Sequence, residues 1–194
     1  MSRSQNTALV FVAVALLFLF WKNSAAADSH PLTGSPALTL ASGMASNLEV
    51  SIRHAGEHKL VLGVTNTGDK PLTLITWNSP LDPIALKLGL VELIPSGSSD
   101  PVQTNTIQVR RKMPPESDSL VTIKPGEKEE NVLELGEPVV PLDKLKGKMS
   151  VRCTGSWMGV WNADEFKTEQ LESVGSTEET QFGDFKAELE SVEL

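Results

Sequence analysis

The stretch from Val64 to Pro83, VTNTGDKPLTLITWNSPLDP, constrains the fold of this chain more than any other part of the sequence. An apolar run ends at the turn residues Asn66-Thr67-Gly68-Asp69, in which Asn and Asp bond the nearby backbone and glycine adopts a positive φ without steric cost. Pro71 lacks an N–H group, so we expect the next strand at Leu72–Trp77. The two prolines in Asn78–Pro83 then end that strand. This stretch therefore predicts a strand, a tight turn and a second strand that ends on a rigid corner.

Further short apolar runs predict strands along most of the chain, and no run has the period of a long helix. The expected strands are Leu48–Ile52, Leu60–Val64, Leu72–Trp77, Ala85–Ile94 with a bulge at Gly89, Thr106–Arg110, Leu120–Ile123, Asn131–Leu135, Lys148–Trp157 and Thr180–Leu194. One helical turn is expected at Leu142–Leu145. A succession of about eight short strands separated by turn signals is typical of a β-sandwich. We therefore expect an all-β fold, an immunoglobulin-like antiparallel β-sandwich of about seven to eight strands, over residues 48–194.

The first 27 residues have the pattern of a secretory signal peptide. Arg3 supplies a positive charge, Ala8–Trp21 is a 14-residue apolar run, and Ala25-Ala26-Ala27 offers small residues for cleavage before Asp28. A helix that spans a bilayer needs about 20 apolar residues, so an uncleaved anchor is the less favoured alternative. Residues 28–47, rich in Ser, Thr, Ala, Gly and Pro, predict a flexible lead-in. We expect a secreted, extracellular protein with no stable membrane association after signal cleavage.

The charge of the chain limits its partners. It has 17 Lys and Arg against 25 Asp and Glu, and residues 1–27 hold two of the basic residues and no acid, so the formal charge falls from −8 to −10 after cleavage. Nucleic acids and anionic membranes require a basic face, so we expect no nucleic-acid partner. Cys153 is the only cysteine in the sequence, so the fold must be stabilised by its core without an internal disulfide.

The sequence around the corner resembles the N-terminal propeptide domain of the fungal deuterolysin-type zinc metallopeptidases. The match falls on Asn66, Thr67, Gly68, Asp69, Leu72, Leu74, Pro80, Leu81 and Asp82. The spacing of Arg110-Arg111-Lys112 and Lys124-Pro125-Gly126-Glu127 also fits that family, and the resemblance extends from about Leu48 to Leu194. Nothing in the chain matches the H-E-x-x-H catalytic domain of those enzymes. The resemblance therefore implies a free-standing propeptide-like domain that is not an enzyme.

The segment His54-Ala55-Gly56-Glu57-His58 spells H-x-x-E-H, the motif of inverted zinc peptidases. That chemistry needs both histidines on one face of a helix so that they reach a single zinc ion. The five residues lie between two strand patterns and contain a glycine, so we expect a loop, with adventitious metal binding by the histidine pair as the alternative. We expect no catalytic residue, no metal site and no cofactor.

Cys153 lies in an alternating strand pattern, which predicts a buried, small apolar side chain. The alternative is a thiolate that occupies the open position of a peptidase's zinc ion. Trp77, Trp157 and Trp161 are predicted to lie in the core, with an exposed Trp161 as an alternative binding anchor. Trp157 and Trp161 are four residues apart, so a strand places both on one face unless Gly159 bends it.

We expect a secreted, non-catalytic protein that binds another protein, namely a secreted zinc metallopeptidase, as an inhibitor or a folding assistant. The candidate contacts are Asn78, Pro80, Leu81, Asp82, Trp157 and Trp161. The cluster Arg110-Arg111-Lys112 is interpreted as a solvated strand end, with a contact to an acidic partner as the alternative. The sequence leaves open a second function class, a secreted fungal effector that binds the cell wall or a host target.

Overall fold

A computed structural model describes residues 43–174 and 180–194 of the chain. The predicted signal peptide and most of the predicted lead-in lie outside the described residues. The elements, in chain order, are η1 (Met44–Asn47), β1 (Leu48–His54), β2 (Lys59–Asn66), β3 (Leu72–Ile75), β4 (Val91–Pro95), η2 (Ser117–Ser119), β5 (Leu120–Ile123), β6 (Lys128–Glu134), η3 (Leu142–Lys144), β7 (Lys148–Asn162), η4 (Thr168–Ser173) and β8 (Gln181–Glu193), where η denotes a 3-10 helix. Within these ranges no helix has the length and apolar character needed to cross a bilayer.

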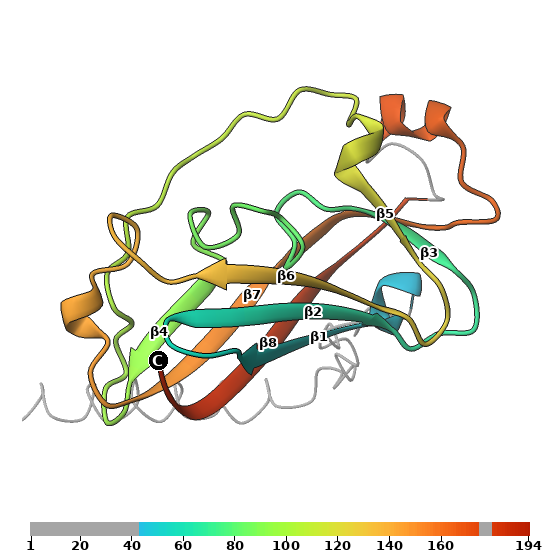
Figure 1. Ribbon diagram of the computed structural model, residues 1–194. Coiled ribbons are helices and arrows are strands. Elements are labelled where there is room, and N and C mark those ends of the chain that lie inside the picture. Colours follow the sequence, from blue (N-terminus) through green and yellow to red (C-terminus); the bar gives the residue numbers. More distant parts are fainter. Residues whose placement is uncertain (1–42, 175–179) are drawn as a thin grey trace, which may run out of the picture. The chain divides into compact units, whose positions relative to one another are not determined.

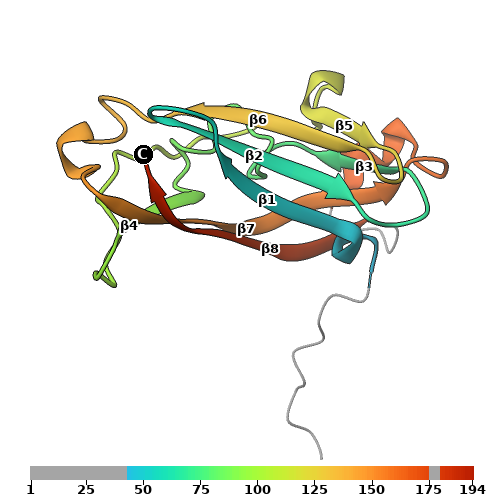
Figure 2. The ribbon, with the colours of Figure 1, turned by 60° about the horizontal axis from the view of Figure 1, so that its bottom comes forward.

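The strands form two antiparallel sheets that lie one above the other (Figure 2). The first sheet has the order β1-β2-β6. The second contains β4, β7, β3 and β5 in that order, with β8 paired to β7 as its fifth strand. Strand β1 at the edge of the first sheet lies over β8 at the edge of the second (Figure 2). The predicted all-β sandwich is therefore confirmed.

The long strand β7 organises the second sheet (Figure 1). It pairs with β8 along most of its length, from Lys148 opposite Glu193 to Val160 opposite Gln181. Both β4 and β3 pair with β7 as well, β4 near its start and β3 at its end. Because a strand has two edges, β4 and β3 share the edge of β7 that β8 leaves open. The chain between β3 and β4, residues 76–90, therefore leaves the sheet and returns to it, and forms the corner predicted from the sequence.

The main core lies between the sheets and follows the alternation of the strands. Leu60, Leu62 and Val64 of β2 and Met149, Val151 and Cys153 of β7 belong to one apolar cluster and are fully buried. Each large aliphatic side chain buried in this way contributes roughly 1.5–3 kcal/mol to folding. The prediction that Cys153 is a buried core residue is confirmed.

A β-bulge separates the two tryptophans of β7. The register of β7 and β8 shifts between Trp157 and Val160, and an extra residue on one strand reverses which face the following side chains occupy. Trp157 packs in the main core, with its ring centroid 4.8 Å from that of Phe185. Trp161 lies in a second cluster with Ile75, Trp77 and Leu171. The predicted burial of all three tryptophans is confirmed. The irregularity expected at Gly159 lies within this shift, so the two tryptophans of β7 do not share a face.

Two expected strands are wrong in whole or in part. Residues 106–110 form no strand: Ile107 donates a single backbone hydrogen bond to the Lys87 carbonyl, and its side chain is 47% exposed. The apolar and polar residues alternate here as in a strand, but this surface segment has no neighbouring strand with which to pair. Residues 85–90 form turns, with Gly89 at a φ of +77°, and the strand begins only at Val91.

Candidate functional site

Asp82 organises the corner between β3 and β4. Its side chain is fully buried, and Oδ2 accepts hydrogen bonds from the Asn78 N–H (2.9 Å) and from Arg111 Nη2 (2.6 Å). Oδ1 accepts a third hydrogen bond, from the Ile84 N–H at 3.1 Å. A buried carboxylate requires such partners because transfer from water to an apolar interior is otherwise costly. Both carboxylate oxygens of Asp82 thus accept hydrogen bonds from its own domain, and the side chain holds both ends of the turn.

Neighbouring elements hold the corner from both sides. Asn131 of β6 donates from Nδ2 to the carbonyls of Pro80 (2.9 Å) and Asp82 (2.8 Å). The guanidinium of Arg111 lies 5.5 Å from the ring centroid of Trp77, within the range of a cation–π contact. Asn78 has a φ of +53°, a left-handed conformation that asparagine tolerates better than most residues. The corner is consequently held in one conformation before any partner arrives.

The structure buries four of the six predicted contact residues. Trp157 and Trp161 are 2% and 1% exposed, and Pro80 and Asp82 are also buried. Asn78 and Leu81 are half-buried and reach the surface. The four buried side chains therefore shape the corner and the end of β7 from within, and Trp161 offers no ring to a partner as a binding anchor.

The two regions singled out from the sequence meet through Met158. Asn78 Nδ2 lies 3.3 Å from Met158 Sδ, and Met158 sits on β7 between the two tryptophans. Met158 is half-buried and packs against the second cluster. The outer surface at this end of the sandwich thus joins the corner to the end of β7, although these segments are 80 residues apart in the sequence.

Sequence reasoning missed Phe182, an exposed ring at the same end. Trp157 is opposite Gly183 and Val160 is opposite Gln181, so Phe182 lies across from the bulge that contains Met158 in the strand pairing. The Phe182 side chain is 48% exposed. The spacing of the two rings indicates this exposure, because Phe182 and Phe185 are three apart on a strand and must face opposite sides. We define Asn78, Met158 and Phe182 as the Phe182 patch.

His54 of the H-x-x-E-H segment is the last residue of β1, and the other four residues, 55–58, form the turn of the β1–β2 hairpin. Gly56 and His58 have positive φ values of 112° and 54°, and His58 Nε2 lies 3.9 Å from Glu57 Oε1. The predicted loop is confirmed. Across residues 43–174 and 180–194, no three or more His, Cys, Asp or Glu side chains are arranged to hold a metal ion.

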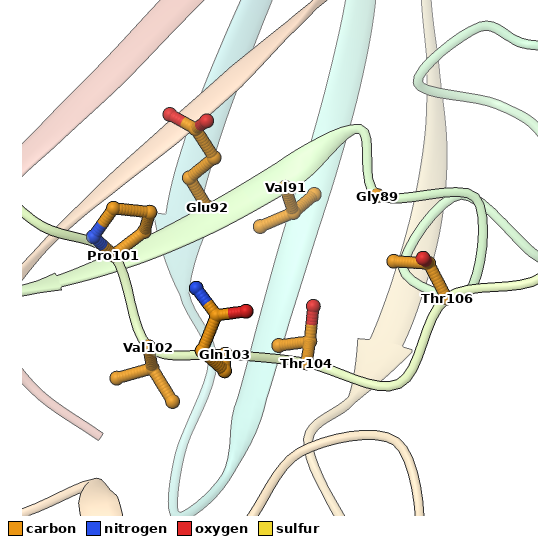
Figure 3. A pocket seen from close by; sticks show the side chains of 8 residues that line it. All are labelled: Gly89, Val91, Glu92, Pro101, Val102, Gln103, Thr104 and Thr106. Carbon is orange, nitrogen blue, oxygen red and sulfur yellow. The ribbon is translucent and has the colours of Figure 1, made fainter.

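Two hollows near β4 share residues 101–103 in their walls. The smaller, about 220 Å³ and shown in Figure 3, is lined by Gly89, Val91, Glu92, Pro101, Val102, Gln103, Thr104 and Thr106. The larger, about 330 Å³, also has Pro95, Pro141 and Lys144 in its wall. Ligand pockets commonly measure roughly 300–1,000 Å³. Glu92, in the wall of the smaller hollow, is already paired with Arg152 Nη1 at 3.3 Å.

Comparison with known proteins agrees with this architecture. The model of the immunoglobulin-like domain family matches residues 47–194. The chain is also 34% identical, over 174 residues, to a protein of the fungus Arthroderma benhamiae that is named "Uncharacterized secreted protein". That match covers 88% of this chain and 82% of the relative, and it supports the secretion predicted from residues 1–27. The two-sheet sandwich of this secreted chain and the family match together show that the chain belongs to the immunoglobulin-like domain family.

Proposed function

We propose that this protein is a non-catalytic binding module that associates with a secreted zinc metallopeptidase, as a detached counterpart of a propeptide. The observation that carries the proposal is the role of the residues behind the resemblance. Asn66 and Asp82 are both fully buried, and each holds its own turn in place. Asn66 Nδ2 donates to the carbonyls of Lys70 and Ile123, both at 2.8 Å, and its Oδ1 accepts from the Gly68 N–H. The residues behind the resemblance thus include two buried side chains that each hold a turn of the fold in place.

The Phe182 patch is the surface that we propose meets the peptidase. It stands on two paired strands and beside a corner that is already held in one conformation, so binding costs little ordering of the chain. An exposed aromatic ring on a rigid support is a typical centre of a protein interface. The module would act by steric occlusion, covering the approach to the peptidase's cleft.

Inhibition of a mature deuterolysin-type peptidase tests the proposal. The secreted protein is titrated against that enzyme and against an unrelated zinc peptidase, and we expect selective inhibition at submicromolar concentration. Phe182→Ser should weaken inhibition at least about tenfold, since a truncated interface anchor costs upwards of roughly 1.4 kcal/mol. Val132→Ser is the matched control, because Val132 is 58% exposed on β6 of the other sheet.

A second assay separates an inhibitor from a folding assistant. The catalytic domain is refolded from denaturant with and without the protein, and the yield of active enzyme is measured. Higher yield without inhibition of the mature enzyme identifies a folding assistant. If the protein neither binds, inhibits nor assists the peptidase, the proposal is overturned, and binding to insoluble wall glycans or host proteins becomes the function to test.

A further inference from the structure

The segment between β4 and η2 carries three consecutive basic residues in an acidic chain. Arg110 and Lys112 are exposed, while the side chain of Arg111 is 26% exposed. Figure 1 shows this yellow-green segment arching outside the two sheets. Before the basic run, the Ile107 N–H donates a backbone hydrogen bond to the Lys87 carbonyl. The next backbone hydrogen bond along the chain is donated by the Ser119 N–H to the Glu116 carbonyl. Within the described structure, residues 108–115 therefore form an eight-residue stretch without a backbone hydrogen bond.

Such a stretch has the properties of an endopeptidase substrate. Endopeptidases hold the substrate as an extended strand through main-chain hydrogen bonds, so a cleavable segment needs backbone groups that the fold has not already paired. Exposed loops are accordingly the preferred sites of proteolytic nicking. Two successive cationic side chains are recognised by two successive acidic subsites, a pattern that distinguishes this segment from isolated lysines. A secreted protein meets such enzymes during and after export.

We infer that Arg110-Arg111-Lys112 is a proteolytic processing site for an endopeptidase specific for paired basic residues, and that cleavage occurs after Arg111. Water is the second reactant: the bond between the Arg111 carbonyl carbon and the Lys112 nitrogen breaks, hydroxide adds to the carbonyl carbon, and the nitrogen takes a proton. The products are a carboxylate at Arg111 and a new amino terminus at Lys112. Cleavage after Lys112 is disfavoured, because Pro114 and Pro115 would then occupy near subsites without N–H donors.

The fold controls access to this site through Arg111. Both overlapping basic pairs, Arg110-Arg111 and Arg111-Lys112, contain this residue, and its Nη2 lies 2.6 Å from the buried carboxylate of Asp82. Arg111 must leave Asp82 and the face of Trp77 before its side chain enters a peptidase subsite. Local opening of the contact between Arg111 and Asp82 therefore limits the rate of cleavage. The same sequence in a free peptide, which lacks this contact, is cleaved faster.

A cut at this position leaves the domain assembled. β2, before the cut, pairs with β6 after it. β3 pairs with both β5 and β7, and β4 pairs with β7. Both sheets thus contain strands from the two fragments. Processing would produce a two-chain protein that is held together by its sheets and its core.

The test is digestion of the folded secreted protein with a serine endopeptidase specific for paired basic residues. We expect two fragments on a denaturing gel, Lys112 as the new amino terminus, and an unchanged elution volume under native conditions. Arg110→Gln/Lys112→Gln removes both basic pairs and keeps Arg111 on Asp82, so it should remain uncut. Lys144→Gln/Lys146→Gln removes the same charge from two exposed lysines elsewhere and should be cut like the wild type.

A synthetic peptide of residues 105–116 is digested in parallel to measure how fast the same site is cleaved outside the fold. Rapid cleavage of the peptide with complete survival of the folded wild type would overturn the inference, because the fold would then protect the segment. Equal cleavage of Arg110→Gln/Lys112→Gln and the wild type would overturn it as well. Melting temperatures of all variants exclude unfolding as the cause of any difference.

Discussion

Arg111 and Asp82 lie 29 residues apart in the sequence and form an ion pair with 2.6 Å between Nη2 and Oδ2. This contact fastens the long segment after β4 to the corner before it. The same carboxylate accepts two backbone hydrogen bonds within the corner, so the Asp82 side chain links the corner to the basic run. Arg111 in turn lies over the ring of Trp77.

Removal of this carboxylate should be costly. Asp82→Ala leaves the guanidinium of Arg111 and two N–H groups without their acceptor, and we expect the free energy of unfolding to fall by about 3 kcal/mol. Urea denaturation measures the change. Glu134→Ala breaks the exposed Lys59–Glu134 pair of 3.4 Å and should alter stability by no more than about 0.5 kcal/mol. Equal effects of the two substitutions would contradict the role assigned to Asp82.

The contact between Gly155 and Phe185 predicts a second loss of stability. A Cβ atom added at Gly155 would lie 2.6 Å from Cζ of Phe185, whose ring also packs on Trp157. Gly155→Ala should therefore destabilise the domain by roughly 1–3 kcal/mol through overpacking. Gly136→Ala is the control, because no atom lies within 4 Å of its added Cβ. Thermal unfolding of both variants checks the prediction, which fails if they unfold at the same temperature.

Cys153 predicts a loss of stability at high pH. Burial raises the pKa of its thiol from 9.0 to about 12, so the unfolded chain loses this proton at lower pH than the folded chain. The stability that the protonated Cys153 thiol contributes is therefore fully present below pH 9. As the pH rises toward 12, the free energy of unfolding falls by about 1.4 kcal/mol per pH unit. Cys153→Ala lacks the titrating thiol and should show a shallower decline. The measurement is urea denaturation from pH 8 to pH 11, and identical slopes would refute the prediction.

The same burial predicts an unreactive thiol. A disulfide reagent should label Cys153 in denaturant but not in the folded protein, because the thiolate is the reactive form. Rapid labelling of the folded protein would instead support the zinc-blocking alternative.

The pKa of Glu130, on the outer face of the first sheet, should depend on its basic neighbours. The hydrogen bond from Arg53, at 2.8 Å, and then that from Lys128 lower the pKa of Glu130 from 4.5 to about 2. The stabilisation from this group is present above pH 4.5 and is lost as the pH falls toward 2. Arg53→Gln should raise the pKa of Glu130, as followed by carbonyl NMR titration. Lys124→Gln, which removes an exposed charge elsewhere, should leave it unchanged.

Much of the fold was predictable from local sequence. The alternation in residues 48–52 and 60–64 and the turn at Asn66–Asp69 specify strands and a turn through contacts of near neighbours. The last strand was likewise expected close to the observed bounds of β8, whereas β7 begins where expected but continues past Trp157 to Asn162. Thr106–Arg110 shows the limit of such patterns, because its alternation is real but no neighbouring strand pairs with it.

The candidate site depended more strongly on long-range structure. Pro80 and Asp82 were correctly placed at a corner, but their burial depends on Asn131 and Arg111, which approach from distant parts of the chain. The proximity of Asn78 and Met158 likewise arises only when the corner meets β7.

The division between sequence and tertiary structure is clearest at Trp157 and Trp161. The sequence alone predicted an all-β, secreted chain with both tryptophans in its core, because composition, alternation and turn residues act locally. Tertiary structure alone decided that they enter different clusters, since the bulge opposite Phe182 exists only when β7 pairs with β8. A one-residue shift in pairing reverses the face of every later side chain, and that register depends on contacts between strands that are distant in the sequence.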